Sequence, residues 1–304
     1  MAFIKNARDY PSHFFDAGNG TDPIGEILHL AREMTGSDVL ASIKRLHYDI
    51  VAMFSGKNPE FKRNTMPYHT LRHTLMVALA VIRFFYGLHF SGHRISGHTL
   101  FQGMLCAYFH DSGMLLKSDD PATSGVGYIS IHEKRSAQFL TEYVKKKELL
   151  PSLSDGVDII IAYTWLGHNP ATFPLHSKRQ QMLGHVVGAA DLLAQMADCY
   201  YLENLPLLFD ELERGKLNTS RNVREFMEQT ETFYRDVVLP RFTSKYSEVF
   251  DAMVKHFVLR YGINRNLYME SINKNLKYLQ IILDQCKDLD CIYARLRRRP
   301  PRIE

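Results

Sequence analysis

Helical periodicity runs through almost the whole chain, and no other feature restricts the fold as strongly. Apolar residues recur at intervals of three and four, and no segment shows a sustained two-residue alternation. Helices are predicted, from this periodicity and its stop signals, at residues 22–35, 37–54, 70–87, 98–116, 131–147, 154–166, 180–203, 206–214, 220–238, 241–261 and 266–287. The pattern therefore predicts an all-α fold.

The length and the absence of internal boundaries predict one domain. A chain of 304 residues can bury a sizeable core as one large domain or two small ones. We find no internal repeat and no low-complexity linker. We therefore expect a single helical domain with N-terminal helices in residues 1–65, a core carrying the chemistry in residues 66–203, and a C-terminal helical extension in residues 204–304.

Charge argues against a nucleic-acid-binding surface. The net charge is +4, and much of it lies in the basic tail "ARLRRRPPRIE" at residues 294–304. This tail is interpreted as solvated, because it has no interleaved aromatic residues; binding to acidic lipid or nucleic acid is the alternative. The oligomeric state is not indicated.

Cysteine usage and the terminal sequence favour a soluble, cytoplasmic protein. The N-terminal segment has no apolar region typical of a signal peptide. The longest apolar stretch, residues 75–88, contains Arg83 and is shorter than a membrane span, so no transmembrane segment is expected. No CxxC pair occurs, and reduced core thiols are predicted at Cys106, Cys199, Cys286 and Cys291.

Two acidic residues fall on faces that the apolar pattern would bury. Asp111 lies on the apolar stripe of the helix predicted at residues 98–116, and Asp191 shares a face with Val187 and Ala194. An unpaired buried carboxylate costs roughly several kcal/mol or keeps its proton. A buried arginine or a helix cap would explain either acid alone. Both together, with His110 beside one of them, favour a metal cation.

Several histidines accompany these acids. His69 and His73 are four residues apart, so they share a face if the helix begins before His69, whereas His69 lies just outside a helix that begins at Thr70. His132 is expected in a first helical turn, with Ser130 and Glu133 as a capping box. The helix dipole there disfavours imidazolium, and metal ligation requires the neutral ring. His168 follows a glycine that is a natural helix stop.

The order of these residues resembles the HD superfamily of metal-dependent phosphohydrolases, over about residues 66–200. The resemblance implies an HD/phosphodiesterase-like helical fold that binds one or two divalent ions (Mn, Fe, Mg or Zn). It implies that the first ion is held by His73, His110, Asp111 and Asp191. It also implies that Asp111 bridges to a second ion held by His132 and His168.

Different stretches of the chain resemble two branches of the superfamily. "YHTLRHTLMV" and "IAYTWLGH" are similar to stretches of cyclic-nucleotide phosphodiesterases, which implies that His69 is the general acid. Thr70, Met114 and Thr164 depart from that branch, which has Asn, His and Asp there. "HDSG", "HEKRSAQFL" and "AADLLAQMAD" resemble the HD-GYP branch, but Met114 replaces its Lys and the GYP tripeptide is missing.

The resemblance implies a metal-dependent phosphohydrolase, first of all a phosphodiesterase that hydrolyses a cyclic nucleotide or similar small phosphoester through a metal-bound hydroxide. His69 and Asp111 are the expected catalytic residues, with His69 protonating the leaving oxygen. Contacts to the phosphate are expected from some of Arg72, Lys134, Arg135 and Asn169; a solvated helix face is the alternative for each. The alternative functions are a nucleotidase or other phosphomonoesterase of the same fold, and a catalytically degenerate HD nucleotide-binding protein.

Overall fold

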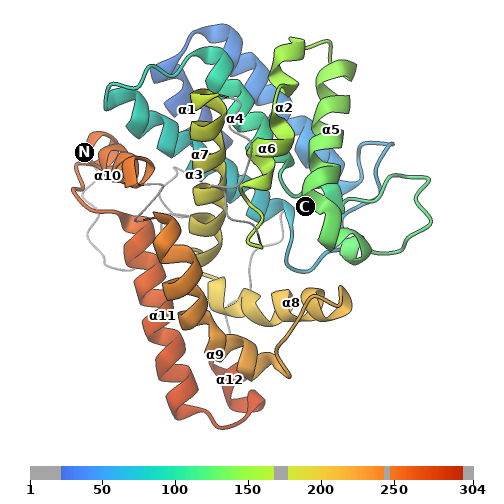
Figure 1. The fold of residues 1–304 in the computed structure, drawn as a ribbon, viewed down its shortest axis with the longest axis vertical. Helices are drawn as coiled ribbons and strands as arrows, with labels where there is room; N and C mark the ends of the chain where they lie inside the picture. The colour runs from blue at the N-terminus through green and yellow to red at the C-terminus, as the bar shows by residue number, and fades with distance from the viewer. Residues whose placement is uncertain (1–21, 168–176, 243–246, 297–304) are drawn as a thin grey trace.

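The structure is a computed structural model that describes residues 22–167, 177–242 and 247–296. Within these ranges every regular element is helical, and an isolated β-bridge joins Phe61 to Lys117 (Figure 1). One large apolar cluster extends from Ile27 near the start of the described chain to Ile292 near its end. The predicted all-α, single-domain fold is confirmed.

The helices follow the predicted order closely. The α-helices are α1 (Ile24–Met34), α2 (Ser37–Ser55), α3 (Leu71–Phe90), α4 (Gly97–Phe109), α5 (His132–Lys146), α6 (Val157–Ala162), α7 (Lys178–Met196), α8 (Tyr201–Arg214), α9 (Val223–Phe233), α10 (Ser247–Tyr261), α11 (Leu267–Gln285) and α12 (Leu289–Arg295). Shorter elements are the 3-10 helices η2 (Ser112–Met114), η3 (Gly125–Ile131) and η4 (Pro151–Ser154) and the π-helix η6 (Tyr234–Val238). The structure departs from the prediction at residues 98–116, where the helix ends at Phe109, and at α12, which was not predicted. It also departs at residues 180–203, where α7 ends at Met196 and α8 begins at Tyr201 and continues through Pro206.

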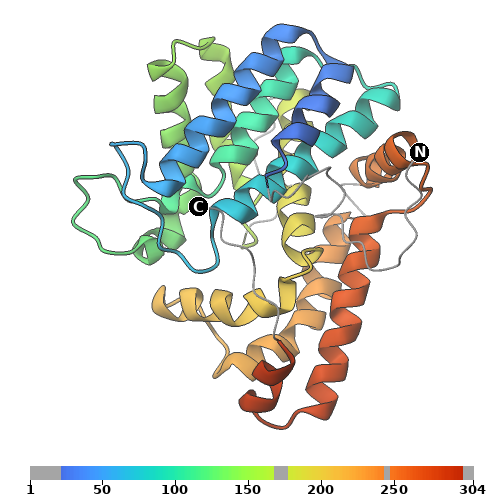
Figure 2. The ribbon, with the colours of Figure 1, turned by 180° about the vertical axis from the view of Figure 1, so that it is seen from behind.

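α3 is the central helix of the fold. Almost every residue from Leu75 to Leu88 is buried, including Arg83. From behind, α1 and α2 cover α3 and α4, and α7 and α10 also pack against α3 (Figure 2). A β-carbon on Gly87 would lie 1.7 Å from the carbonyl oxygen of Ala252, so only glycine permits the close approach of α10. α3 thus holds the N-terminal helices, α7 and α10 in one body.

Among the described residues, α3 alone has the length and apolar composition of a membrane span. The helix is longer than the apolar stretch of residues 75–88, because it begins at Leu71 and ends at Phe90 and so runs for 20 residues. Of its most apolar window, 83% is buried inside the protein, as in the core helix of a soluble protein.

The C-terminal part of the chain lies below this body in the view of Figure 1. α8 runs across the lower end of α7, α9 and α12 lie beneath α8, and α11 runs down beside them. Asn275 on α11 donates to the carbonyl oxygens of Met196 and Asp198, at 2.8 Å each, and so ties α11 to the end of α7. α8 is therefore placed directly beneath the segment that carries His69.

The prediction of reduced cysteines is correct for two residues and wrong for two. Cys106 and Cys199 are free and buried. Cys286 and Cys291 form a disulfide across the turn between α11 and α12. The predicted helix at residues 266–287 would have kept these residues apart, but α11 ends at Gln285 and the turn brings their Cα atoms to 5.3 Å. The cysteines therefore no longer support a reducing compartment.

Candidate metal centre

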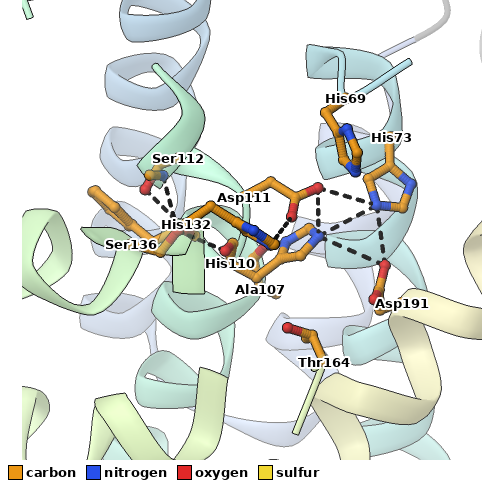
Figure 3. Close-up of polar contacts among 12 residues, drawn as sticks. His69, His73, Ala107, His110, Asp111, Ser112, His132, Ser136, Thr164 and Asp191 are labelled. Carbon is orange, nitrogen blue, oxygen red and sulfur yellow. Dashed lines mark hydrogen bonds and ion pairs between the residues drawn. The ribbon is translucent and has the colours of Figure 1, made fainter. Parts of the chain in front are cut away.

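His73, His110 and Asp111 form a group able to hold a metal ion, with one ligand atom of each lying within 4.8 Å of the others. The Nε2 atoms of the two histidines are 3.3 Å apart. Oδ2 of Asp111 lies 3.4 Å from Nε2 of His73 and 3.0 Å from Nε2 of His110 (Figure 3). Imidazole nitrogens and carboxylate oxygens in this arrangement are ligands for divalent transition metals and for Mg²⁺.

Asp191 completes the group from α7. Its Oδ1 atom lies 3.0 Å from Nε2 of His73 and 3.7 Å from Nε2 of His110 (Figure 3). The four predicted ligands of a first ion therefore come together, although they are spread over residues 73–191. We call His73, His110, Asp111 and Asp191 the four-ligand cluster.

The end of α4 orients two of these ligands. Nδ1–H of His110 donates to the carbonyl oxygen of Ala107 at 2.8 Å, which leaves Nε2 as the nitrogen that faces the other members of the cluster. Asp111 follows in a turn conformation (φ −104°, ψ 0°) before η2 begins. The helix thus stops where the sequence pattern predicted continuation, and the turn aims adjacent side chains at the same point.

α5 is fastened to this turn by Ser136 and by a glycine. The Ser136 hydroxyl donates to the carbonyl oxygen of His110 at 2.6 Å and accepts from N–H of Gly113 at 2.8 Å. A β-carbon on Gly113 would lie 2.1 Å from the carbonyl oxygen of His132. Any side chain at residue 113 would therefore push α5 away from the cluster.

Gly113→Ala is expected to destabilise the protein by about 1–3 kcal/mol, the usual cost of forcing a group into a packed interior. The free energy of unfolding, measured by denaturant titration, checks this. Gly127→Ala is the matched control, because a β-carbon there meets nothing within 4 Å. Equal stability of the two variants would contradict the close approach of α5.

His132 lies on the other side of Asp111. It is the first residue of α5, as predicted, and its Nδ1–H donates to the carbonyl oxygen of Ile129 at 2.5 Å. Its Nε2 lies 3.5 Å from Oδ1 of Asp111. Asp111 therefore presents one oxygen to the other members of the four-ligand cluster and the other oxygen to His132.

The predicted capping box at Ser130 and Glu133 is absent. Ile131 is the N-cap residue of α5, and no side chain caps the helix there. The reason is that η3 runs directly into α5, so Ser130 lies inside a 3-10 helix. The carboxylate of Glu133 lies instead 3.4 Å from Nδ1 of His132.

His69 lies just outside α3, the second of the two predicted alternatives. Thr70 is the extended N-cap residue, and α3 begins at Leu71. Nδ1 of His69 lies 2.5 Å from Oε2 of Glu211, whose other oxygen accepts from the backbone N–H groups of Tyr68 (2.6 Å) and His69 (3.3 Å). The ring centroid of His69 is 6.4 Å from that of His73 and 6.3 Å from that of His132. The His69 ring therefore lies about equally far from His73, in the four-ligand cluster, and from His132.

Glu211 was not predicted as a site residue. It is fully buried, although α8 also carries the exposed acids Asp210 and Glu213. No sequence pattern distinguishes it from these neighbours, because its burial results from α8 crossing beneath residues 68–69. Only the tertiary arrangement identifies it as the partner of His69.

Burial and the surrounding carboxylates set the protonation of the site. Burial lowers the pKa of His69, but the hydrogen bond to Glu211 and the charge of Asp111 outweigh it, so the net shift is upward. Burial likewise opposes the charged form of His110, and Asp111 raises its pKa to about 9. Oδ2 of Asp111 is buried without a hydrogen-bond partner among the described residues. A cation fits here, because it would satisfy that oxygen and replace the proton that the acids otherwise draw onto His110.

The two predicted substrate-binding arginines contact other parts of the protein. Arg72 donates two hydrogen bonds to Asp198, at 2.5 and 3.1 Å, and lies over the Tyr200 ring. The Arg135 guanidinium lies 3.3 Å from the ring centroid of Tyr128. None of these partners belongs to the four-ligand cluster. A role of Arg72 and Arg135 in phosphate binding therefore stays a prediction.

The remaining predicted residues are placed less specifically. Lys134 is exposed on α5. His168 and Asn169 lie outside the described residues, so the second set of ligands is described only at Asp111 and His132.

Comparison with known proteins adds no family assignment. No protein-family model, curated protein or solved structure matches the chain. What the chain can do is therefore inferred from its own geometry. That geometry consists of a helical fold and a group of two histidines and an aspartate that could hold a metal ion, with Asp191, His132 and the His69–Glu211 pair around it.

Proposed function

We propose that this chain is a metal-dependent phosphohydrolase of the HD superfamily, and that it hydrolyses a phosphodiester such as a cyclic nucleotide. The observation that carries the proposal is the four-ligand cluster, in which two imidazoles and two carboxylates meet at contacts of 3.0–3.7 Å. Asp111 is buried and Asp191 is half-buried, and two acids drawn in around the same pair of imidazoles are costly without a cation. The order of the ligands along the chain is that of the superfamily.

The ligands divide naturally between two ions. His73, His110, Asp191 and Oδ2 of Asp111 would hold the first, and Oδ1 of Asp111 with Nε2 of His132 would contribute to the second. His168 remains a predicted ligand of the second ion. The mixed nitrogen and oxygen set suits Mn, Fe, Mg or Zn. Bound ions would polarise the phosphoryl oxygens and lower the pKa of a water nucleophile.

His69 has the surroundings of a general acid. Because Nδ1 is occupied by Glu211, Nε2 is the nitrogen left to donate a proton. Burial opposes the charged ring, but the hydrogen bond to Glu211 and the nearby carboxylates raise the pKa of His69 above its ordinary value, which favours the protonated form that a general acid needs. Expulsion of an alkoxide from a phosphodiester needs such a proton, so this pair favours an ester substrate.

A degenerate, nucleotide-binding protein is the second candidate, and two positions favour it. Met114 is buried beside Met66, Val126 and Ile129, and the Thr164 hydroxyl donates to the carbonyl oxygen of Ile161 at 2.8 Å. Cyclic-nucleotide phosphodiesterases have polar, ionisable residues at both positions. The four-ligand cluster argues against this candidate, because a site without a metal would have no need to bring both acids together.

Elemental analysis combined with a substrate panel tests the proposal. We expect a divalent metal in the purified protein, and turnover of bis-p-nitrophenyl phosphate at least about tenfold faster than that of p-nitrophenyl phosphate, a difference of about 1.4 kcal/mol in barrier. Cyclic nucleotides complete the panel. Faster hydrolysis of the monoester would favour a nucleotidase. Protein without metal, and without activity after addition of Mn²⁺ or Mg²⁺, would refute the proposal.

A further inference from the structure

The turn between α11 and α12 contains a disulfide that the proposed hydrolysis does not use. Cys286 and Cys291, which form it, are five residues apart in the sequence. A disulfide that closes so short a loop restricts the unfolded chain less than one that closes a long loop. Its main effect is therefore local, because it fixes where α12 begins relative to the end of α11.

α12 depends on this covalent link. It has seven residues, fewer than an isolated helix needs to persist in water. Ile292 is its fully buried residue, and Leu289 is partly buried. Asp288 caps the helix, with its Oδ1 atom accepting from N–H of Cys291 at 2.8 Å. Without the disulfide, a few such contacts would have to hold α12 in place.

The two cysteines of the pair differ in access. Cys286 is 1% exposed, whereas Cys291 is half-buried. Thiol–disulfide exchange depends on which sulfur a thiolate can reach, so the sulfur of Cys291 is the one open to attack. The other cysteines, Cys106 and Cys199, are buried free thiols, and burial raises the pKa of the Cys106 thiol. Redox chemistry in this chain is therefore directed to the Cys286–Cys291 pair.

The disulfide is connected to α8 through α9. Arg224 on α9 donates to the carbonyl oxygens of Leu283, at 3.0 Å, and of Cys286. Phe226 on the same helix packs against Phe209 of α8, with 5.8 Å between the ring centroids. Both α9 and α12 lie beneath α8 (Figure 1). The turn that the disulfide closes thus belongs to the group of helices that supports α8.

α12 also faces α8 directly. Burial and the charge of Asp210 on α8 raise the pKa of Tyr293 on α12, so this phenol lies near that carboxylate. The next residue of α8, Glu211, is the partner of His69. A displacement of α12 would therefore act on the turn of α8 that carries Glu211.

We propose that the Cys286–Cys291 pair is a redox-modification site, and that its reduction by a dithiol releases α12 and loosens the turn of α8 that carries Glu211. One thiolate of the dithiol attacks Sγ of Cys291, the S–S bond breaks, and Cys286 leaves as a thiolate that takes up a proton. The second thiolate of the reductant then attacks the mixed disulfide and releases Cys291, which is protonated in turn. The protein gains two electrons and two protons, and the dithiol becomes a disulfide.

Thiol labelling and amide hydrogen exchange of the full chain test this inference without substrate or metal, so its outcome is independent of the proposed function. We expect millimolar dithiothreitol to open Cys286 and Cys291 to iodoacetamide in the folded protein, while Cys106 and Cys199 stay unlabelled. Reduction should speed exchange about tenfold or more in residues 287–296 and about threefold or more in residues 206–214. Exchange in residues 75–88 of α3 should stay unchanged.

Two variants separate the disulfide from other effects of the reductant. Cys291→Ser cannot form the bond, so it should exchange like the reduced protein and should not respond to dithiothreitol. Lys287→Ala, at an exposed position in the same turn, keeps both cysteines and should respond like the wild type. Thermal melting establishes that the variants fold, and the two forms of the wild type give the same comparison if Cys291→Ser does not.

Three results would overturn the inference. The first is a disulfide that resists dithiothreitol until the whole protein unfolds. The second is equal exchange of α12 in the oxidised and reduced forms, which would show that its other contacts are sufficient to hold it. The third is faster exchange in α12 with no change in α8, which would remove the link to Glu211.

Discussion

Asp111→Asn is expected to remove most of the bound metal and to lower turnover by about a thousandfold or more, since metal ions contribute several kcal/mol to such reactions. The two carboxylate oxygens of Asp111 face different predicted ligands. Oδ2 faces His73 and His110, and Oδ1 faces His132. The neutral amide keeps the shape of the side chain but offers one weaker oxygen ligand and no charge.

Metal content by elemental analysis and turnover of a phosphodiester measure this effect. Asp251→Asn is the matched control, because Asp251 is exposed on α10 and the same chemical change there should alter neither quantity. Thermal melting of both variants establishes that they fold. An Asp111→Asn protein that keeps its full metal content would show that Asp111 is not needed to hold the ion.

Most of the fold could be predicted because helical periodicity is a local property. The apolar stripes of α1, α2, α7 and α11 were sufficient to place these helices to within a few residues at most of their ends. The end of α4 could not be predicted, because the apolar stripe continues through Met114. There the contacts of His110 and Gly113 with α5 outweigh the local pattern.

The two acids of the four-ligand cluster could be predicted for a different reason, whereas their grouping with His73 and His110 was implied by the resemblance to the HD superfamily. Asp111 and Asp191 are acids in otherwise apolar stripes, so each contradicts the pattern around it, and such contradictions mark functional positions. Glu211 does not interrupt an apolar stripe, since it lies among other acids on a helix with polar neighbours. The Cys286–Cys291 pairing also depends on where α11 ends, a boundary that periodicity does not fix.

His69→Ala is expected to slow turnover by about a hundredfold to ten-thousandfold, the usual contribution of a general acid, while leaving the metal content unchanged. The imidazole contacts Glu211 and faces the cluster without belonging to it. Its removal should therefore affect proton transfer and not ion binding. Glu211 keeps its hydrogen bonds from the backbone N–H groups of residues 68 and 69, so the fold should persist.

The pH dependence distinguishes this role from a structural one. An acid acts only while protonated, so the activity that depends on His69 is present below its pKa and is lost as pH rises through it. Because the net shift is upward, the wild-type rate should fall at a pH above the ordinary histidine value of 6.5. This fall should be absent in His69→Ala, whereas His93→Ala, at an exposed loop position, should keep it. Loss of metal from His69→Ala, or an unchanged pH profile, would instead make His69 a ligand or a structural residue.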